Sequence, residues 1–339
     1  MRYSKFDHTW LSLLLQLNNM TQQPFLTMKG LKETVNYYPL NKSFDFFLAL
    51  VLILSGAQVA IAETPSSIKW NDGSHCEGSF RNSQLDGLGV CTYSNGDRYE
   101  GNFLSGVFSG VGLMVYANGD RYEGNFRDGL RHGIGVMAYA NGDRYEGGFR
   151  NDLLSGSGLW VAINGDRYEG QFQNGQREGM GKLSLASGDH YEGEFRYNLL
   201  NGKGVATNST GDRREGTFRD GRLQGRGSLV AARGWRYEGM FDNDQPNGQG
   251  SLAYANGDQY TGNFRQGQQS GTGNMVYSNG DHCEGDFLND RLNGSGRCTY
   301  ANGDHYEGQF NNGLWHGNGT LTTTNGAQFN GRWNNGTLQ

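Results

Sequence analysis

The chain repeats itself every 23 residues. Stepping by 23 from Cys76 to residue 329 gives twelve copies of one pattern, with no insertion or deletion between them. A fixed period of this length indicates a repeat architecture, in which each unit buries its apolar face against its neighbours. The length of 339 residues would allow two ordinary domains. The period instead predicts one elongated array over residues 74–335.

Each copy contains two runs with the alternation of a β-strand. Tyr122, Gly124 and Phe126 are spaced by two, with polar residues between them, so they are expected on one face of a strand. The second run follows a Gly-x-Gly, and its apolar residues Met137 and Tyr139 are again spaced by two. A helix is excluded because each of its many glycines would cost about 1 kcal/mol. The fold class is therefore all-β.

Turn signals divide the copies into hairpins. Most copies close on Asn-Gly-Asp, as at Asn118-Gly119-Asp120, and Asn-Gly between two strand patterns is a strong hairpin signal. We interpret Asn-Gly-Asp as turn chemistry, because the period does not fit the nonapeptide of calcium-binding β-rolls. Stacking about two strands per repeat predicts a sheet on the order of 110 Å long. Its rings would form an aromatic seam, packed between repeats rather than open to sugars. Over four copies this seam comprises Tyr99, Phe103, Tyr122, Phe126, Tyr145, Phe149, Tyr168 and Phe172.

The pattern Tyr-Glu-Gly-x-Phe-x-x-Gly-x-x-x-Gly-x-Gly closely resembles the MORN (membrane occupation and recognition nexus) repeat. The resemblance covers residues 74–335, in twelve phased copies. It implies an elongated, antiparallel and twisted β-solenoid of hairpins. It also implies scaffolding, dimerisation or lipid contact as the function, with no catalysis by the repeats and no cofactor.

The leader, residues 1–62, has the parts of a secretory signal peptide. Lys29, Lys32 and Lys42 lie before an apolar run over 46–54, and Ala60-Ile61-Ala62 supplies the small residues of a cleavage site. We expect cleavage after Ala62 and an exported product.

Two alternatives for this region stay open. Residues 46–62 could act as a retained membrane anchor, although the stretch is short for a span. The initiator is either Met1 or Met28, because a leader that starts at Met1 is long. The remaining boundaries are a short linker over 63–73 and a tail over 336–339.

The four cysteines replace repeat residues in pairs. Cys76 and Cys283 stand at the Tyr position, and only in these two repeats is the facing apolar position also Cys, as Cys91 and Cys298. Coincident replacement on facing strands predicts the disulfides Cys76–Cys91 and Cys283–Cys298, which suit an oxidising compartment. The alternative is four small buried side chains. A zinc site is disfavoured because no Cys-x-x-Cys occurs.

A basic position precedes the Tyr in most copies and is followed, two residues later, by Glu. Both should lie on the face opposite the rings. One hypothesis is a track for anions or lipid headgroups, and the other is a solvated ladder of cross-strand Arg–Glu pairs. The arginines concerned are Arg98, Arg121, Arg144, Arg167, Arg213 and Arg236. His282 and His305 occupy the same position, one repeat apart, without a further ligand set for a metal.

Composition narrows the function. The formal net charge of −5 disfavours nucleic acid, whose phosphates need a basic surface. No catalytic triad, phosphate loop or metal motif stands out from the repeat, so we expect no enzyme. The sequence favours an exported scaffold with a protein partner along its sheet. The alternative is a peripheral module that binds lipid headgroups or a membrane surface, and the resemblance adds a homodimer as a further expectation.

Overall fold

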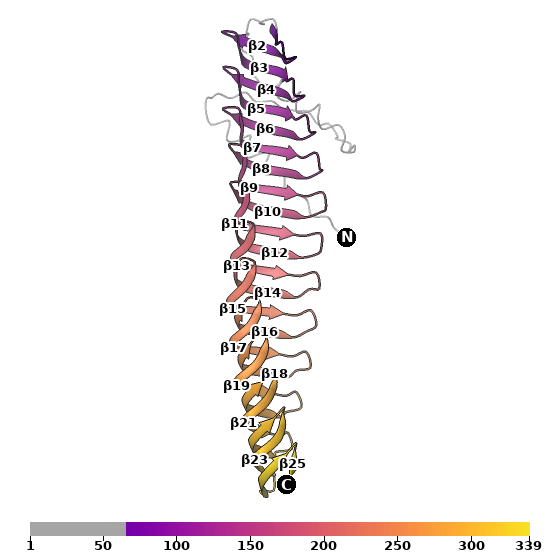
Figure 1. The fold of residues 1–339 in the computed structure, drawn as a ribbon, viewed down its shortest axis with the longest axis vertical. Helices are drawn as coiled ribbons and strands as arrows, with labels where there is room; N and C mark the ends of the chain where they lie inside the picture. Colours follow the sequence, from indigo (N-terminus) through magenta and orange to yellow (C-terminus); the bar gives the residue numbers. More distant parts are fainter. Residues whose placement is uncertain (1–65) are drawn as a thin grey trace, which may run out of the picture. The chain divides into compact units, whose positions relative to one another are not determined.

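The computed structural model describes residues 66–339 as a single antiparallel sheet of 25 strands (Figure 1). Each strand pairs with the strands before and after it in sequence, from β1 with β2 to β24 with β25. The all-β prediction is therefore confirmed. The leader, the apolar run 46–54, the cleavage after Ala62 and the anchor over 46–62 lie outside the described residues.

Every complete repeat contributes a seven-residue strand and then a nine-residue strand. The seven-residue strands are β2 (His75–Arg81), β4 (Arg98–Leu104), β6 (Arg121–Arg127), β8 (Arg144–Arg150), β10 (Arg167–Gln173), β12 (His190–Arg196), β14 (Arg213–Arg219), β16 (Arg236–Asp242), β18 (Gln259–Arg265), β20 (His282–Leu288), β22 (His305–Asn311) and β24 (Gln328–Asn334). The nine-residue strands are β3 (Gln84–Thr92), β5 (Val107–Val115), β7 (Leu130–Ala138), β9 (Leu153–Val161), β11 (Gln176–Ser184), β13 (Leu199–Thr207), β15 (Arg222–Val230), β17 (Gln245–Ala253), β19 (Gln268–Val276), β21 (Arg291–Thr299) and β23 (Leu314–Thr322).

Short strands close both ends of the described sheet. β1 (Ser66–Lys69) pairs with β2, and β25 (Thr337–Leu338) pairs with β24. The segment predicted as a linker, 63–73, thus contains a strand, as does the predicted tail, 336–339. Both segments extend the hairpin pattern by one pairing beyond the repeats.

The register aligns equivalent residues into rows across the sheet. Tyr122 pairs with Met114 on one side and with Met137 on the other. Gly124 likewise pairs with Gly112 and with Gly135. The glycines of successive strands therefore form a continuous ladder beside the row of tyrosines, on the side of the sheet that we call the aromatic face.

The tyrosine ring lies over this glycine ladder. A Cβ added to Gly135 would lie 2.4 Å from the Tyr122 hydroxyl oxygen and 2.5 Å from its Cε2. The ring has no exposed surface, and its hydroxyl donates a 2.9 Å hydrogen bond to the carbonyl of Asn125. Burial raises the pKa of the Tyr122 hydroxyl, which keeps it neutral. Because glycine has no side chain, the glycine ladder leaves the space that the tyrosine rings occupy.

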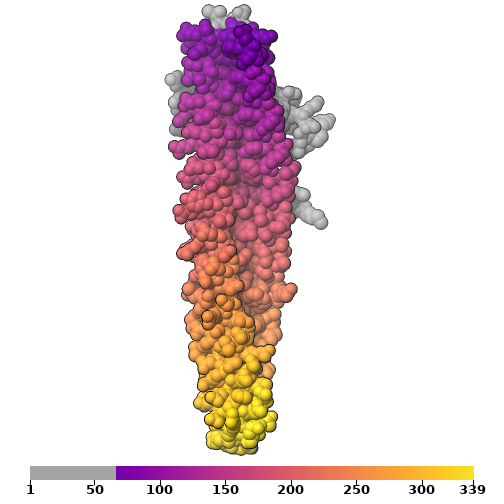
Figure 2. Space-filling view, viewed as in Figure 1, coloured from indigo at the N-terminus to yellow at the C-terminus, as the bar shows by residue number. Residues whose placement is uncertain are grey.

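The aromatic residues make the core. All eight residues of the predicted seam are buried, and each Phe contacts the Tyr of its own repeat. Phe126, Phe149 and Phe172 also contact the Tyr of the repeat before. Phe126, for example, packs edge-to-face on Tyr122 at 5.0 Å and on Tyr99 at 5.1 Å between ring centroids. These rings therefore connect neighbouring repeats and are not open for stacking on a sugar. Figure 2 shows the outside of the stack, where successive repeats follow one another in sequence order.

The two turns of each repeat differ in kind. The tight turn lies inside the hairpin, as at Asp128-Gly129, where φ is +53° and +79°. Positive φ at both central residues matches the twist of the flanking strands. The turn predicted at Asn-Gly-Asp is also present, and at Asn118-Gly119-Asp120 it joins the antiparallel strands β5 and β6. That motif lies in the longer loop between hairpins, where only its glycine, such as Gly119, has positive φ. Because this loop has more residues, Asn118 does not need a positive φ.

Candidate functional site

The predicted arginine track lies on the face of the sheet opposite the aromatic face, which we call the outer face. Each of its six arginines forms an ion pair with the Glu two residues later on the same strand. The nitrogen–oxygen distances are 2.8 Å for Arg98–Glu100, 3.7 Å for Arg121–Glu123, 2.8 Å for Arg144–Glu146, 2.8 Å for Arg167–Glu169, 2.6 Å for Arg213–Glu215 and 3.1 Å for Arg236–Glu238.

The expected cross-strand Arg–Glu ladder is wrong in its direction, because the pairs run along strands. The residues opposite Arg98 are Thr92 and Val115, so no carboxylate faces it across the sheet. Glu100, two positions along the same face, is the acid within reach. Exposed pairs of this kind contribute at most about 1 kcal/mol each. They do neutralise the arginines, which weakens the lipid-headgroup hypothesis.

The outer face also carries an apolar strip. It consists of exposed or half-buried side chains on strands β3, β5, β7, β9 and β11, namely Leu88, Val90, Val111, Leu113, Ile134, Val136, Leu159 and Met180. Leu88, Val111 and Ile134 are each about half exposed, at 51%, 50% and 48%. The equivalent positions of later repeats are polar except at Val205, as Thr272 and Ser295 illustrate. The strip therefore distinguishes the first five repeats from the rest.

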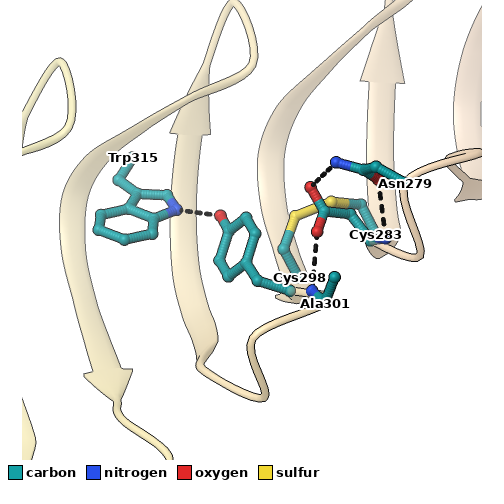
Figure 3. The surroundings of a disulfide bond; sticks show 7 residues. Asn279, Cys283, Cys298, Ala301 and Trp315 are labelled. Atoms are coloured by element: carbon teal, nitrogen blue, oxygen red, sulfur yellow. Dashed lines mark hydrogen bonds between the residues drawn. A yellow bond between two sulfur atoms is a disulfide. The ribbon is translucent and has the colours of Figure 1, made fainter.

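The structure contains the two predicted disulfides, Cys76–Cys91 and Cys283–Cys298, each with 4.1 Å between the Cα atoms. In both cases the two cysteines are directly opposite each other in the register of one hairpin. The disulfide thereby replaces a Tyr–Met pair in the row described above. Figure 3 shows Cys283 and Cys298 beside the loops of two neighbouring hairpins.

A row of aspartates joins the loops of successive repeats, which sequence reasoning missed. The Asp281 carboxylate accepts hydrogen bonds from the Asn279 side chain at 2.9 Å and from the Ala301 backbone N–H, one repeat later, at 2.8 Å (Figure 3). The same inter-repeat bond recurs at Asp97, Asp120, Asp143, Asp166, Asp189, Asp212, Asp258 and Asp304. The recurrence of Asp directly after the loop glycine, as at Asp97, Asp120 and Asp189, was the signal that could have revealed it. Trp235 interrupts the row once.

These aspartates should make stability depend on acid pH. The backbone N–H of the next repeat lowers the pKa of Asp166, Asp212, Asp258 and Asp304. A folded pKa below the unfolded value of about 3.9 means that the stabilisation is present above that pH and is lost as pH falls through the folded pKa. We expect the urea midpoint of the array to fall below about pH 4. In the double variant Asp258→Asn, Asp304→Asn, the urea midpoint should fall less steeply with decreasing pH. Parallel plots of urea midpoint against pH for the variant and the wild type would refute this contribution.

Among residues 66–339, no group of His, Cys, Asp and Glu side chains is arranged to hold a metal ion, His282 and His305 included. The same residues contain no helix with the length and hydropathy that a membrane span needs.

Solved structures resemble the chain only weakly. The SAS-4 (dCPAP) TCP domain of Drosophila melanogaster, in complex with a proline-rich motif of Ana2, has 14% identity and a TM-score of 0.29, covering 56% of this chain and 97% of that one. The TCP10 domain of Danio rerio CPAP, in complex with a STIL peptide, has 11% identity and a TM-score of 0.25, covering 80% and 100%. Virginiamycin B lyase of Staphylococcus aureus has 9% identity and a TM-score of 0.14, covering 80% and 88%. Scores this low support no inference about the present chain.

The repeat itself has a family match, although no curated protein matches the chain. Eleven consecutive segments match the MORN repeat, at residues 76–98, 99–121, 122–144, 145–167, 168–190, 191–213, 215–236, 237–259, 260–282, 283–305 and 306–328. The twelfth predicted copy is outside this match but forms the β24–β25 hairpin. Each matched segment corresponds to one repeat of the sheet with its tyrosine row and glycine ladder, and the chain belongs to the MORN repeat family.

Proposed function

We propose that this protein is an exported, non-catalytic scaffold that binds a protein partner along its sheet. The observation that carries the proposal is the apolar strip on the outer face. Apolar side chains, exposed or half-buried, recur at two register positions over five neighbouring repeats, interrupted only at Ser157 and Lys182. A surface of this kind marks an interaction site. The paired Glu and Arg side chains between them supply a polar surround that suits a partner protein.

Export is supported by the two disulfides. Cysteine pairs of this kind form and persist in oxidising compartments and are rare where thiols are kept reduced. Both pairs are buried, with Cys91 and Cys298 only 1% and 3% exposed, so they serve the fold and not a redox surface. An exported array is thus proposed to present its strip to a partner in the cell envelope or outside the cell.

Charge placed on the strip should abolish partner capture. We expect the variant Val111→Glu, Ile134→Glu to lose a protein that the wild type retains from the envelope fraction, because two carboxylates would be desolvated at the contact. The matched control is Thr272→Glu, Ser295→Glu, which adds equal charge at the same offset on later repeats. Quantitative mass spectrometry of cross-linked complexes measures the difference.

Three other outcomes would count against the proposal. Equal capture of the partner by both variants would show that partner binding does not depend on the strip. Loss of self-association alone, seen by light scattering, would identify the partner as a second copy of the chain. Salt-sensitive pelleting with anionic vesicles that requires Arg121 and Arg144 would favour the lipid module instead.

A further inference from the structure

Tyrosine occupies the first position of the loop between hairpins in two sets of three successive repeats, and Thr323 has this position in the last loop. The tyrosines are Tyr93, Tyr116, Tyr139, Tyr254, Tyr277 and Tyr300. Four successive repeats between these sets have smaller residues at the same position, namely Ala162, Leu185, Asn208 and Ala231.

Several of these tyrosines contact a side chain of the following repeat. The Tyr300 hydroxyl accepts a 2.7 Å hydrogen bond from Trp315 Nε1 (Figure 3), and the Tyr254 hydroxyl accepts one of 2.6 Å from Gln269 Nε2. Tyr93 contacts the ring of the equivalent residue, Phe108, at 6.3 Å between centroids. Where the tyrosine is missing, the side chain beneath it should therefore be uncovered.

A hollow opens on the aromatic face where the tyrosines are missing. Its volume is about 640 Å³, and it runs along strands β9 to β13. Its apolar walls include Trp160, Leu183, Tyr191, Phe195 and Leu200. This size and lining are within the range of ligand-binding clefts.

Arg177 lies in this hollow and carries its permanent charge among aromatic rings. Its guanidinium carbon is 5.5 Å from the centroid of Tyr168 and 5.9 Å from that of Phe195. Its Nη2 donates a 2.9 Å hydrogen bond to the backbone carbonyl of Asn198. Burial lowers the pKa of Arg177, in accord with an incompletely solvated cation.

The same arrangement occurs two repeats earlier with its charge neutralised and covered. Arg131 is over the rings of Tyr122 and Phe149, and its Nε is 3.0 Å from a carboxylate oxygen of Asp152. Tyr116 is the loop tyrosine of the preceding repeat, and the charge of Arg131 acts on its hydroxyl.

Arg177 has neither of these partners. Asn198 replaces the aspartate, and Ala162 replaces the tyrosine. Within residues 66–339, no carboxylate forms an ion pair with Arg177. Asp166 also lines the hollow, and its charge acts on Arg177 from beyond ion-pair distance. Its oxygens accept hydrogen bonds from Ala186 and Asn164 in the aspartate row.

We propose that the hollow around Arg177 binds an extended segment of a partner protein that supplies an aromatic side chain and a carboxylate. The array itself shows this chemistry, because Tyr116 and Asp152 supply the same two groups to Arg131. A guanidinium held over aromatic rings binds a carboxylate by charge-assisted hydrogen bonds. The vacated loop positions, Ala162 and Leu185, leave room for the incoming ring.

The occupant is inferred to be a peptide because the lining of the hollow comes from strands of successive repeats, β9 to β13. It lies on the aromatic face, whereas the apolar strip lies on the outer face. The inference rests on the proposed function only in taking the ligand to be a protein.

The test uses the complete chain and a fluorescently labelled peptide with Phe-Glu-Phe between Gly-Ser flanks. We expect saturable binding by fluorescence anisotropy with a dissociation constant below about 1 mM. Matched peptides with Phe-Gln-Phe or Ala-Glu-Ala should bind at least about tenfold more weakly, since each lacks one of the two groups.

Variants of the hollow restore what the other repeats contain. Ala162→Tyr returns the covering tyrosine, and Asn198→Asp returns the internal carboxylate, so each should weaken Phe-Glu-Phe binding at least about tenfold. Arg177→Leu introduces the residue found at this position in neighbouring repeats, and it should make Phe-Glu-Phe and Phe-Gln-Phe bind equally. Asn312→Asp adds the same charge at a distant hairpin turn and should leave binding unchanged.

Four results would overturn the proposal. These are no binding of Phe-Glu-Phe at millimolar concentration, undiminished binding by Ala162→Tyr, equal loss in the Asn312→Asp control, or binding of dodecanoate in place of the peptide. The variant Val111→Glu, Ile134→Glu should bind the peptide normally. A failure of the outer-face proposal therefore leaves the hollow testable, and the reverse is also true.

Discussion

Replacing Gly124 with alanine is expected to remove at least about 3 kcal/mol from the local free energy of unfolding. The added Cβ would lie 2.5 Å from the Gly135 Cα and 2.7 Å from the Ile134 carbonyl oxygen. Both atoms belong to the paired strand, so no side-chain rotation relieves the contact. Hydrogen exchange of amides in β6 and β7 measures the loss repeat by repeat, since a long array need not unfold in one step.

Gly135→Ala should behave differently because the atoms its Cβ meets belong to the Tyr122 ring. Shortening that side chain, as Tyr122→Leu, frees the space. We expect a double-mutant cycle between Gly135→Ala and Tyr122→Leu to show favourable coupling of about 1–3 kcal/mol. The cycle between Gly124→Ala and Tyr122→Leu should show less coupling, because the backbone clash remains.

Gly156→Ala provides the control for adding a methyl group to a strand glycine. Nothing lies within 4 Å of its Cβ, but its φ is +74°, so the cost is conformational and about 1 kcal/mol. Equal losses at Gly124 and Gly156 would mean that backbone conformation, and not space beneath the rings, explains the glycine ladder.

Much of this fold could be predicted from the sequence because the period supplies long-range information. A single copy shows only that Tyr122, Gly124 and Phe126 share a face. Repetition without gaps adds that each copy meets an identical neighbour, so the ring rows and the facing glycines follow. The coincident replacement at Cys76 and Cys91 identified a cross-strand pair for the same reason.

The remaining features depend on side-chain geometry that a period does not encode. Asn118-Gly119 and Asp128-Gly129 are both good turn sequences, and only loop length decides which one closes the hairpin. Arg98 chooses Glu100 because no acid lies across the sheet from it. The sequence shows that Ala162 replaces the loop tyrosine. That this replacement opens a hollow could be inferred only after the structure showed that the loop tyrosine contacts the next repeat.

Breaking the Cys76–Cys91 disulfide is expected to cost about 3 kcal/mol, the chain-entropy value for a loop closed over a separation of 15 residues. The loss should be local. Beyond β2 the described sheet has only the four-residue β1, so the first hairpin gains little from a neighbour on that side. In Cys91→Ser we expect fast hydrogen exchange over β1 to β4, a reactive Cys76 thiol and an unchanged centre.

Cys283–Cys298 offers the internal comparison. It has the same separation and the same place in its hairpin, but β19 and β22 continue the sheet on both sides. Replacing Cys298 with serine should therefore loosen β20 and β21 less than Cys91→Ser loosens β2 and β3. Reductant applied to the wild type should reproduce both losses, and applied to Cys91→Ser it should add only the second. Equal increases in hydrogen exchange at the two sites would show that neighbouring strands do not protect the hairpin when its disulfide is broken.

The same cysteines test export, because a disulfide in the isolated protein records the compartment in which it formed. We expect intact protein from its native source to show no thiol that reacts with iodoacetamide before reduction and four afterwards. The expected N-terminus is Glu63, produced by cleavage after Ala62. Four reactive thiols before reduction, on a chain that retains 46–62, would contradict both export and cleavage. Paired cysteines on such a chain would instead favour the retained anchor, since oxidation requires only that the array reach the oxidising side.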